Sequence, residues 1–119
     1  MASYKLGPII GELGGGGEVT KVPISVGSMP GAGDHHLYHV EIPEGEAWVV
    51  ACVADYVARD ASASRAPTIV IGEHESPFAG SGGIFGTAVE VYGPVDVIYR
   101  ESWSPGQGGI TGHVWAVKL

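Results

Sequence analysis

Apolar and polar residues alternate in short segments along most of this chain, and glycine, proline, serine or aspartate stands at nearly every boundary between segments. Alternation with a period of two is typical of β-strands that turn one face to a core and the other to solvent. The strand-like segments are residues 18–26, 36–42, 47–58, 66–72, 87–93, 94–103 and 111–119. The pattern predicts an all-β fold, a single β-sandwich or jelly-roll-like domain of about seven antiparallel strands.

The alternation also indicates which side chains face the core. In residues 37–42, one face carries only apolar side chains, those of Tyr38, Val40 and Ile42. The opposite face carries Leu37, His39 and Glu41. We expect Trp48 and Trp115 in the core, because valine and alanine surround both. Cys52 is the only cysteine and lies in the apolar run AWVVACVA, so we expect it to be a small buried residue.

The first 17 residues differ from the rest of the chain. They end in the run GELGGGG, which is too flexible to hold a fixed element by itself. They also carry an apolar cluster, Tyr4, Leu6, Ile9 and Ile10, which we expect to pack against another surface. The sequence therefore divides into a flexible N-terminal arm with a glycine-rich hinge, residues 1–17, and a sandwich domain, residues 18–119.

Two connections between predicted strands have recognisable turn chemistry. Pro43, Glu44 and Gly45 form a predicted turn, with proline at the first corner and glycine available for a positive φ. Near the end of the chain, residues 94–119 have the pattern of a hairpin, in which the glycine-rich loop SPGQGG separates two strands.

The charge of the chain limits its partners. Six lysines and arginines stand against 13 aspartates and glutamates, a formal net charge of −7. Nucleic-acid affinity depends largely on lysine and arginine, so we expect no nucleic-acid ligand. No apolar run approaches the roughly 20 residues of a membrane helix, and the N-terminus lacks the pattern of a signal peptide. We expect synthesis in the cytoplasm of a host, without a signal peptide and without a membrane partner.

The densest chemistry is in the segment GDHHLYHVEI, which contains His35, His36, His39 and Glu41. Imidazole and carboxylate groups are ligands of zinc and iron, so a metal site is one interpretation. The segment invites comparison with the first motif of cupins, but its H-x-H pair is absent, and His113 is the only late candidate ligand. Because these residues alternate with apolar ones, we favour a solvated strand face, with no metal and no cofactor.

Three predicted loops suggest a second kind of binding. The segments SWSPGQGG, HESPFAGSGG and DASASRA are rich in small polar residues, and aromatic side chains flank them: Phe78, Phe85 and Trp103. Aromatic faces stack on sugar rings, so these loops suit a glycan. The alternative is that they are ordinary sandwich loops, which we favour. No nucleophile elbow, phosphate loop or zinc-protease motif is present, so we expect no enzymatic activity.

The phrase IPEGEAW between two strands, the strand TIVIG, and VEVYGPVDVIYR followed by a terminal strand resemble the small β-sandwich accessory proteins of tailed-phage virions. Those proteins decorate capsids or form tail and fibre knobs. The resemblance covers residues 40–119. It implies a structural role without catalytic residues, and the arm fits it because such proteins often bind neighbours through flexible arms.

Together these observations predict a structural assembly protein, most simply a virion component for capsid decoration or a tail or fibre. We expect it to bind neighbouring subunits and other virion proteins through its arm and its sandwich faces. A symmetric homo-oligomer is the common arrangement for such units, and a trimer is our first expectation. Two alternatives stay open: a glycan- or receptor-binding sandwich module, and a cupin-like metal-binding protein that uses His35, His36, His39 and Glu41.

Overall fold

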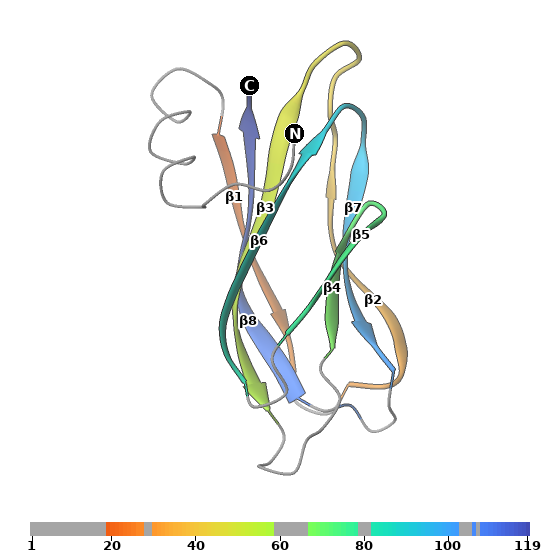
Figure 1. The fold of residues 1–119 in the computed structure, drawn as a ribbon, viewed down its shortest axis with the longest axis vertical. Coiled ribbons are helices and arrows are strands. Elements are labelled where there is room, and N and C mark those ends of the chain that lie inside the picture. Colours follow the sequence, from red (N-terminus) through yellow and green to blue (C-terminus); the bar gives the residue numbers. More distant parts are fainter. Residues whose placement is uncertain (1–18, 28–29, 59–66, 79–81, 103–105, 107) are drawn as a thin grey trace.

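The computed structural model describes residues 19–27, 30–58, 67–78, 82–102, 106 and 108–119, without the side chains of Val19 and Phe85. These residues form two four-stranded antiparallel sheets packed face to face (Figure 1). The described residues form no helix, and therefore none that is long and apolar enough to cross a membrane. The predicted all-β sandwich is confirmed. The proposed arm, residues 1–17 with Tyr4, Leu6, Ile9 and Ile10, lies outside the described residues.

Eight strands make up the two sheets. Sheet A has the order β1 (Val19–Val26), β8 (Gly108–Lys118), β3 (Trp48–Ala58), β6 (Gly83–Val91). Sheet B has the order β2 (Gly33–Val40), β7 (Val95–Glu101), β4 (Thr68–Ile71), β5 (His74–Pro77). The alternation pattern did not predict β5, because this strand has four residues, three of them exposed, and ends in proline. His74, expected on a surface loop, is exposed at the start of this strand.

The strands pair in a nested order. The first pairs with the eighth, the second with the seventh, the third with the sixth and the fourth with the fifth, all antiparallel. This is the arrangement of a jelly roll, in which one long antiparallel ribbon wraps into two sheets. The predicted hairpin over residues 94–119 is wrong, because β7 belongs to sheet B and β8 to sheet A.

The core lies between the sheets and consists of alternate residues from each strand. Trp48 is 7% exposed and its indole Nε1 donates a hydrogen bond to Glu46, so its predicted core position is confirmed. Cys52 is fully buried, and burial raises the pKa of its thiol to about 12. Such a thiol stays protonated at neutral pH and is chemically inert.

One end of the core contains a group of packed aromatic rings. Phe78 packs on Tyr56, with ring centroids 5.2 Å apart, and on Tyr99, with centroids 6.5 Å apart. The Tyr99 hydroxyl donates a hydrogen bond of 2.9 Å to the carbonyl oxygen of Gly108, and burial together with nearby Glu101 raises the pKa of this hydroxyl. The hydrogen bond joins the end of sheet B to the first residue of β8, across the sandwich.

The predicted turn after β2 connects the two sheets. The backbone N–H of Glu46 donates to the carbonyl oxygen of Pro43 at 3.2 Å, and Gly45 has a φ of +83°. A positive φ at the third position of a four-residue turn is typical of type II, where glycine is favoured. Trp115 departs from its predicted core position: it is partly buried and packs on the outer face of sheet A, with the Lys21 ammonium 4.7 Å from its ring centroid.

Candidate functional site

The outer face of sheet B carries most of the paired charges of the described residues. Strand β2 is at the edge of this sheet, and β7 is its antiparallel neighbour in the middle. In β7, Val95, Val97 and Tyr99 are buried in the core. The residues between them therefore project outward: Asp96, Ile98 and Arg100.

A β-bulge in β2 decides which histidines reach this face. The register of β2 against β7 shifts between His36 and Tyr38, so Leu37 is an extra residue in the strand. In a regular strand, His36 and His39 would point to opposite faces, because they are three positions apart. With the bulge, they are paired with Ile98 and Asp96 and share the outer face. Bulges commonly redirect a side chain in this way.

The bulge corrects one sequence prediction and agrees with others. Leu37 was expected on the same face as His39 and Glu41, but it packs against the core because the extra residue changes the alternation. His39 and Glu41 lie on the solvent face as predicted, and both are exposed. The three residues expected on the apolar face also face the core: Val40 and Ile42 are buried, and Tyr38 is partly buried.

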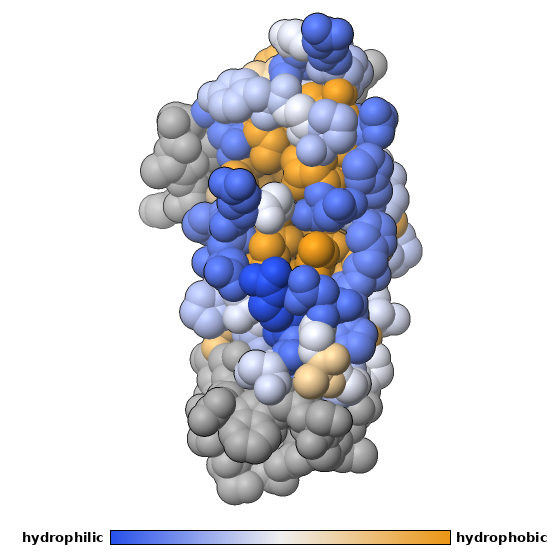
Figure 2. Space-filling view, turned by 90° about the vertical axis from the view of Figure 1, so that its right-hand side faces the viewer, coloured by the Kyte–Doolittle hydropathy of each residue, from blue (hydrophilic) through white to orange (hydrophobic). Residues whose placement is uncertain are grey.

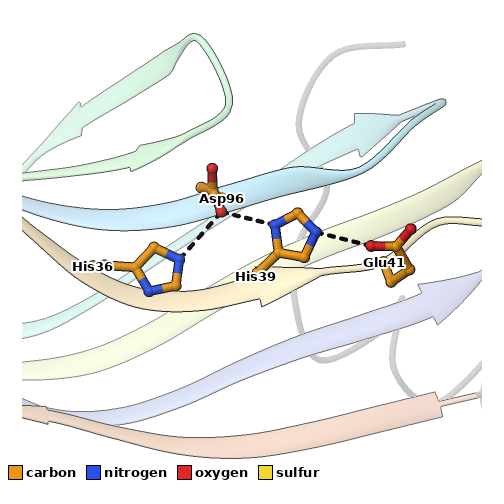
Figure 3. A network of polar contacts seen from close by, with 4 residues as sticks. All are labelled: His36, His39, Glu41 and Asp96. Atoms are coloured by element: carbon orange, nitrogen blue, oxygen red, sulfur yellow. Dashed lines mark hydrogen bonds and ion pairs between the residues drawn. The ribbon is translucent and has the colours of Figure 1, made fainter.

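The outward-facing residues form a continuous chain of hydrogen bonds (Figure 3). His39 lies between two carboxylates, with Nδ1 2.8 Å from Asp96 Oδ1 and Nε2 2.9 Å from Glu41 Oε2. His36 Nε2 lies 3.1 Å from the same Asp96 oxygen. Asp96 therefore joins both histidines, and the chain runs along the surface from His36 to Glu41.

The partners of these groups shift their pKa values. Hydrogen bonds to Asp96 and Glu41 raise the pKa of His39 above its ordinary value of 6.5. Hydrogen bonds from His39 and His36 lower the pKa of Asp96. When both ring nitrogens of His39 donate to carboxylates, the imidazole is in its charged form. His39 and Asp96 are therefore both charged at pH values between the lowered pKa of Asp96 and the raised pKa of His39, and both side chains are open to solvent.

A second ion-paired group lies beside the first on the same face. The Arg100 guanidinium donates to both carboxylate oxygens of Asp34, at 2.7 and 3.1 Å, and to Glu75 at 2.8 Å. The hydrogen bond from Arg100 lowers the pKa of Asp34. These contacts connect β2, β7 and β5. Figure 2 shows the face, with hydrophobic residues in its middle and hydrophilic residues around them.

The histidines considered as metal ligands do not converge on one point. His35 points to the other side of β2, where its Nε2 donates a 2.6 Å hydrogen bond to the Gly31 carbonyl and its ring lies 6.1 Å from that of Tyr99. His113 belongs to β8 in the other sheet, next to Trp115. Within the part of the chain that the structure describes, no group of three or more histidine, cysteine or acidic side chains has the arrangement of a metal site.

The chain of histidines and carboxylates offers little for catalysis. A nucleophilic mechanism needs a hydroxyl or thiol hydrogen-bonded to the base, and among the described residues neither His36 nor His39 has such a partner. Their partners are carboxylates, and the side chains of His36 and Asp96 are more than half exposed.

The aromatic residues proposed for a glycan site are mostly outside this description. Phe78 is 3% exposed and packs on Tyr56, so its ring is not available to stack on a sugar. This corrects the expectation for Phe78: the residue after β5 turns into the core and does not lie on a loop surface. The side chain of Phe85 and the whole of Trp103 lie outside the described residues.

Four members of the polar face were not identified from the sequence: Asp34, Glu75, Asp96 and Arg100. The alternation of VDVIYRE places Asp96 and Arg100 on the face opposite Val95, and this signal is present in the chain. It does not tell which strand lies beside β7. The pairing of His39 with Asp96 joins residues that are 57 positions apart, so it depends on the topology of the whole sandwich.

Comparison with known proteins adds little. No protein-family model matches the chain, and no curated protein matches it. Among solved structures, the chain is similar to BpGH86A, a β-porphyranase of glycoside hydrolase family 86 from the human gut bacterium Bacteroides plebeius. The TM-score is 0.34 and the sequence identity 17%, over 87% of this chain and 21% of that one. The chain thus spans about a fifth of that enzyme, and a likeness at this level carries no argument about activity.

Proposed function

We propose that this protein is a structural assembly subunit without enzymatic activity, and that it is a component of a virion, in a capsid decoration or in a tail or fibre. It binds copies of itself and other virion proteins through its sheet faces and its N-terminal arm. It takes no cofactor. The expected assembly is a symmetric homo-oligomer, with a trimer as the first candidate.

The observation that supports this proposal is the nested pairing of the eight strands, β1 with β8, β2 with β7, β3 with β6 and β4 with β5. An eight-stranded jelly roll with this order occurs in viral capsid proteins, lectins and cupins. Cupins use a metal bound inside the barrel. Here the space between the sheets is filled by apolar side chains such as Val50, Val97 and Val114, each at most 1% exposed.

The ion-paired outer face of sheet B supports the same function. A face with charges of both signs favours specific contact with a complementary surface, because a partner must match the pattern of charges. Ile98 is partly exposed in the middle of that pattern, in register with Val70, which is buried beside it. Apolar residues inside a polar border are the usual composition of a protein–protein contact.

Sedimentation tests the proposal. Purified full-length protein is expected to sediment as a defined oligomer, and to co-sediment with the particles or tail assemblies formed by proteins encoded beside it. A protein that stays monomeric at high micromolar concentration and never co-sediments with a particle would contradict an assembly role. Binding to a glycan array under the same conditions would instead favour the alternative function, a glycan- or receptor-binding sandwich module.

A further inference from the structure

The outer face of sheet A carries an apolar patch. Cross-strand pairs place Val49 beside Val117, and Ala51 between Trp115 and Ala88. The alternate residues of β3, Trp48, Val50 and Cys52, belong to the core, so the patch residues point away from it. We call these five residues, Val49, Ala51, Ala88, Trp115 and Val117, the outer patch.

The outer patch is buried, although it faces away from the core. Val49 and Val117 have no exposed surface, and Ala51 and Ala88 are 1% exposed. Outward-facing residues of a two-sheet sandwich are ordinarily solvated. The described residues form only two layers, and no described strand lies outside sheet A (Figure 1). Trp115 packs against this patch, and a further part of the chain would complete its cover.

The covering part would come from a segment outside the described residues, and the points at which these segments join the strands indicate which one. Along the chain, segments 28–29, 59–66, 79–81 and 107 are joined to strand ends of sheet A that are far from the patch, where Val26 pairs with Ile110 and Tyr56 with Gly83. Segment 103–105 follows β7 of sheet B. Residues 1–18 adjoin Val19, whose register partner is Val117 of the outer patch. The N-terminal segment is therefore the one that enters sheet A beside the patch.

We propose that residues 1–13 dock on the outer patch of their own chain and add a third layer over sheet A. Their apolar side chains, Tyr4, Leu6, Ile9 and Ile10, match the chemistry of the patch. Neighbouring strands lie about 4.8 Å apart, so Val49 is only roughly 10 Å from Val19. Residues 14–18 span up to about 17 Å, and the glycines among them allow the chain to reverse.

Docking within the chain is favoured over docking on a neighbour in dilute solution, because a short flexible linker gives an effective concentration on the order of millimolar. The proposal does not depend on a role in assembly. If the protein does assemble through its arm, the arm of one copy can leave its own patch and occupy the equivalent patch of the next. Such an exchange conserves the contacts and is an accessible route to oligomers.

Photo-cross-linking of the full-length protein tests the proposal. Benzoylphenylalanine in place of Trp115, which is partly exposed, puts an aromatic probe at the rim of the patch. Irradiation of the monomer at low micromolar concentration is expected to join the probe to residues 1–13 of the same chain, with a yield independent of protein concentration. The same probe in place of Ile98, on the face of sheet B, is the matched control and is expected to form no such link.

A second variant tests the chemistry of the contact. Replacing Tyr4, Leu6, Ile9 and Ile10 together with serine is expected to abolish the link from position 115 while the far-ultraviolet circular dichroism spectrum stays the same. Links from position 115 only to residues outside 1–13, or only between two chains, would overturn the proposal. A link that persists in the serine variant would also overturn it, because apolar burial would then not hold the arm.

Discussion

His39 shows how two carboxylates set the charge of one exposed imidazole. Its raised pKa means that its ion pairs stabilise the folded protein fully below about pH 6.5, and that this contribution is lost as the pH rises through the raised value. The lowered pKa of Asp96 acts in the opposite direction: its contribution is present above its ordinary value of 3.8 and is lost as the pH falls through the lowered value. The ion pair between His39 and Asp96 is therefore complete in mildly acidic solution.

Asp96→Asn is expected to lower the pKa of His39 toward its ordinary value, because it removes the first of the hydrogen bonds that raise it. Titration followed by the NMR signals of the imidazole ring measures this pKa directly. Asp34→Asn is the matched control: it removes a carboxylate from the same face that pairs with Arg100 and not with His39. An unchanged His39 pKa in Asp96→Asn would show that the hydrogen bond does not form in solution.

Trp48 carries a large share of the packing at its end of the core. Trp48→Ala is expected to cost about 3–5 kcal/mol of unfolding free energy, since removal of a buried indole leaves a cavity, and to yield unfolded or insoluble protein. Chemical denaturation measures the cost in any soluble fraction. Tyr92→Ala, at a residue that is 67% exposed, serves as the control and is expected to change stability by less than about 0.5 kcal/mol. A native melting temperature for Trp48→Ala would contradict the packing described here.

The fate of the two tryptophans shows what alternation can and cannot predict. Trp48 and Trp115 have similar apolar neighbours in the sequence, yet one faces the core and the other the outer patch. Alternation separates the two faces of a strand. It does not tell which face meets the opposite sheet when both are apolar, as they are in β3 and β8.

The bulge in β2 inserts one residue, Leu37, and thereby places His36 and His39 on the same face of sheet B. Deletion of Leu37 removes the extra residue and leaves Tyr38 opposite Val97 and His39 opposite Asp96, so the register with β7 is conserved. We expect the variant to fold and its unfolding free energy to fall by about 1–2 kcal/mol, the contribution of a partly buried leucine side chain. Hydrogen exchange reports whether β2 still pairs with β7, and thermal unfolding measures the loss of stability.

Deletion of Val97 from β7 is the matched control, because that strand has no extra residue. The deletion would turn the side chains of Ile98 and Arg100 toward the core and that of Tyr99 toward solvent. The sheet is therefore expected not to form. If deletion of Leu37 unfolds the protein as completely as deletion of Val97, Leu37 is not an extra residue in β2 and the bulge described above is wrong.

Strand β8 runs between β1 and β3 with glycine at a point of close approach. A Cβ on Gly112 would collide with the carbonyl oxygen of Val53, whereas a Cβ on Gly31 would meet nothing within 4 Å. Gly112→Ala is therefore expected to destabilise the protein by about 1–3 kcal/mol, the usual cost of overpacking, while Gly31→Ala stays near the native melting temperature. Equal melting temperatures would show that β3 can move away at little cost.

At the level of elements, the sequence predicts most strands because their alternation is local. It misses β5, a polar four-residue strand that is stable only beside β4. It also misplaces the partner of β8. The apparent hairpin of residues 94–119 follows from sequence order, but in a jelly roll the strand nearest along the chain usually lies in the other sheet.

At the level of the whole molecule, strand pairing depends on contacts between distant parts of the chain. Val19 pairs with Val117 and Gly33 with Glu101. No local pattern encodes these partners, because several apolar strands of similar length could be exchanged without loss of alternation. The polar face could not be predicted for the same reason: Asp96 meets His36 and His39 only after β2 and β7 are placed side by side.

Removal of residues 1–17 separates the sandwich from its arm. The described strands and their core begin at Val19, so the truncated protein is expected to fold, with an unchanged far-ultraviolet circular dichroism spectrum. If the arm docks on the outer patch as proposed, the truncated protein should bind an apolar dye more strongly than the full chain, because Val49 and Val117 would then be uncovered. In light scattering it should lose the oligomer, because the arm can no longer be exchanged between copies. If the truncated protein unfolds, the arm is part of the core; if it assembles as before, association comes from the sheet faces alone.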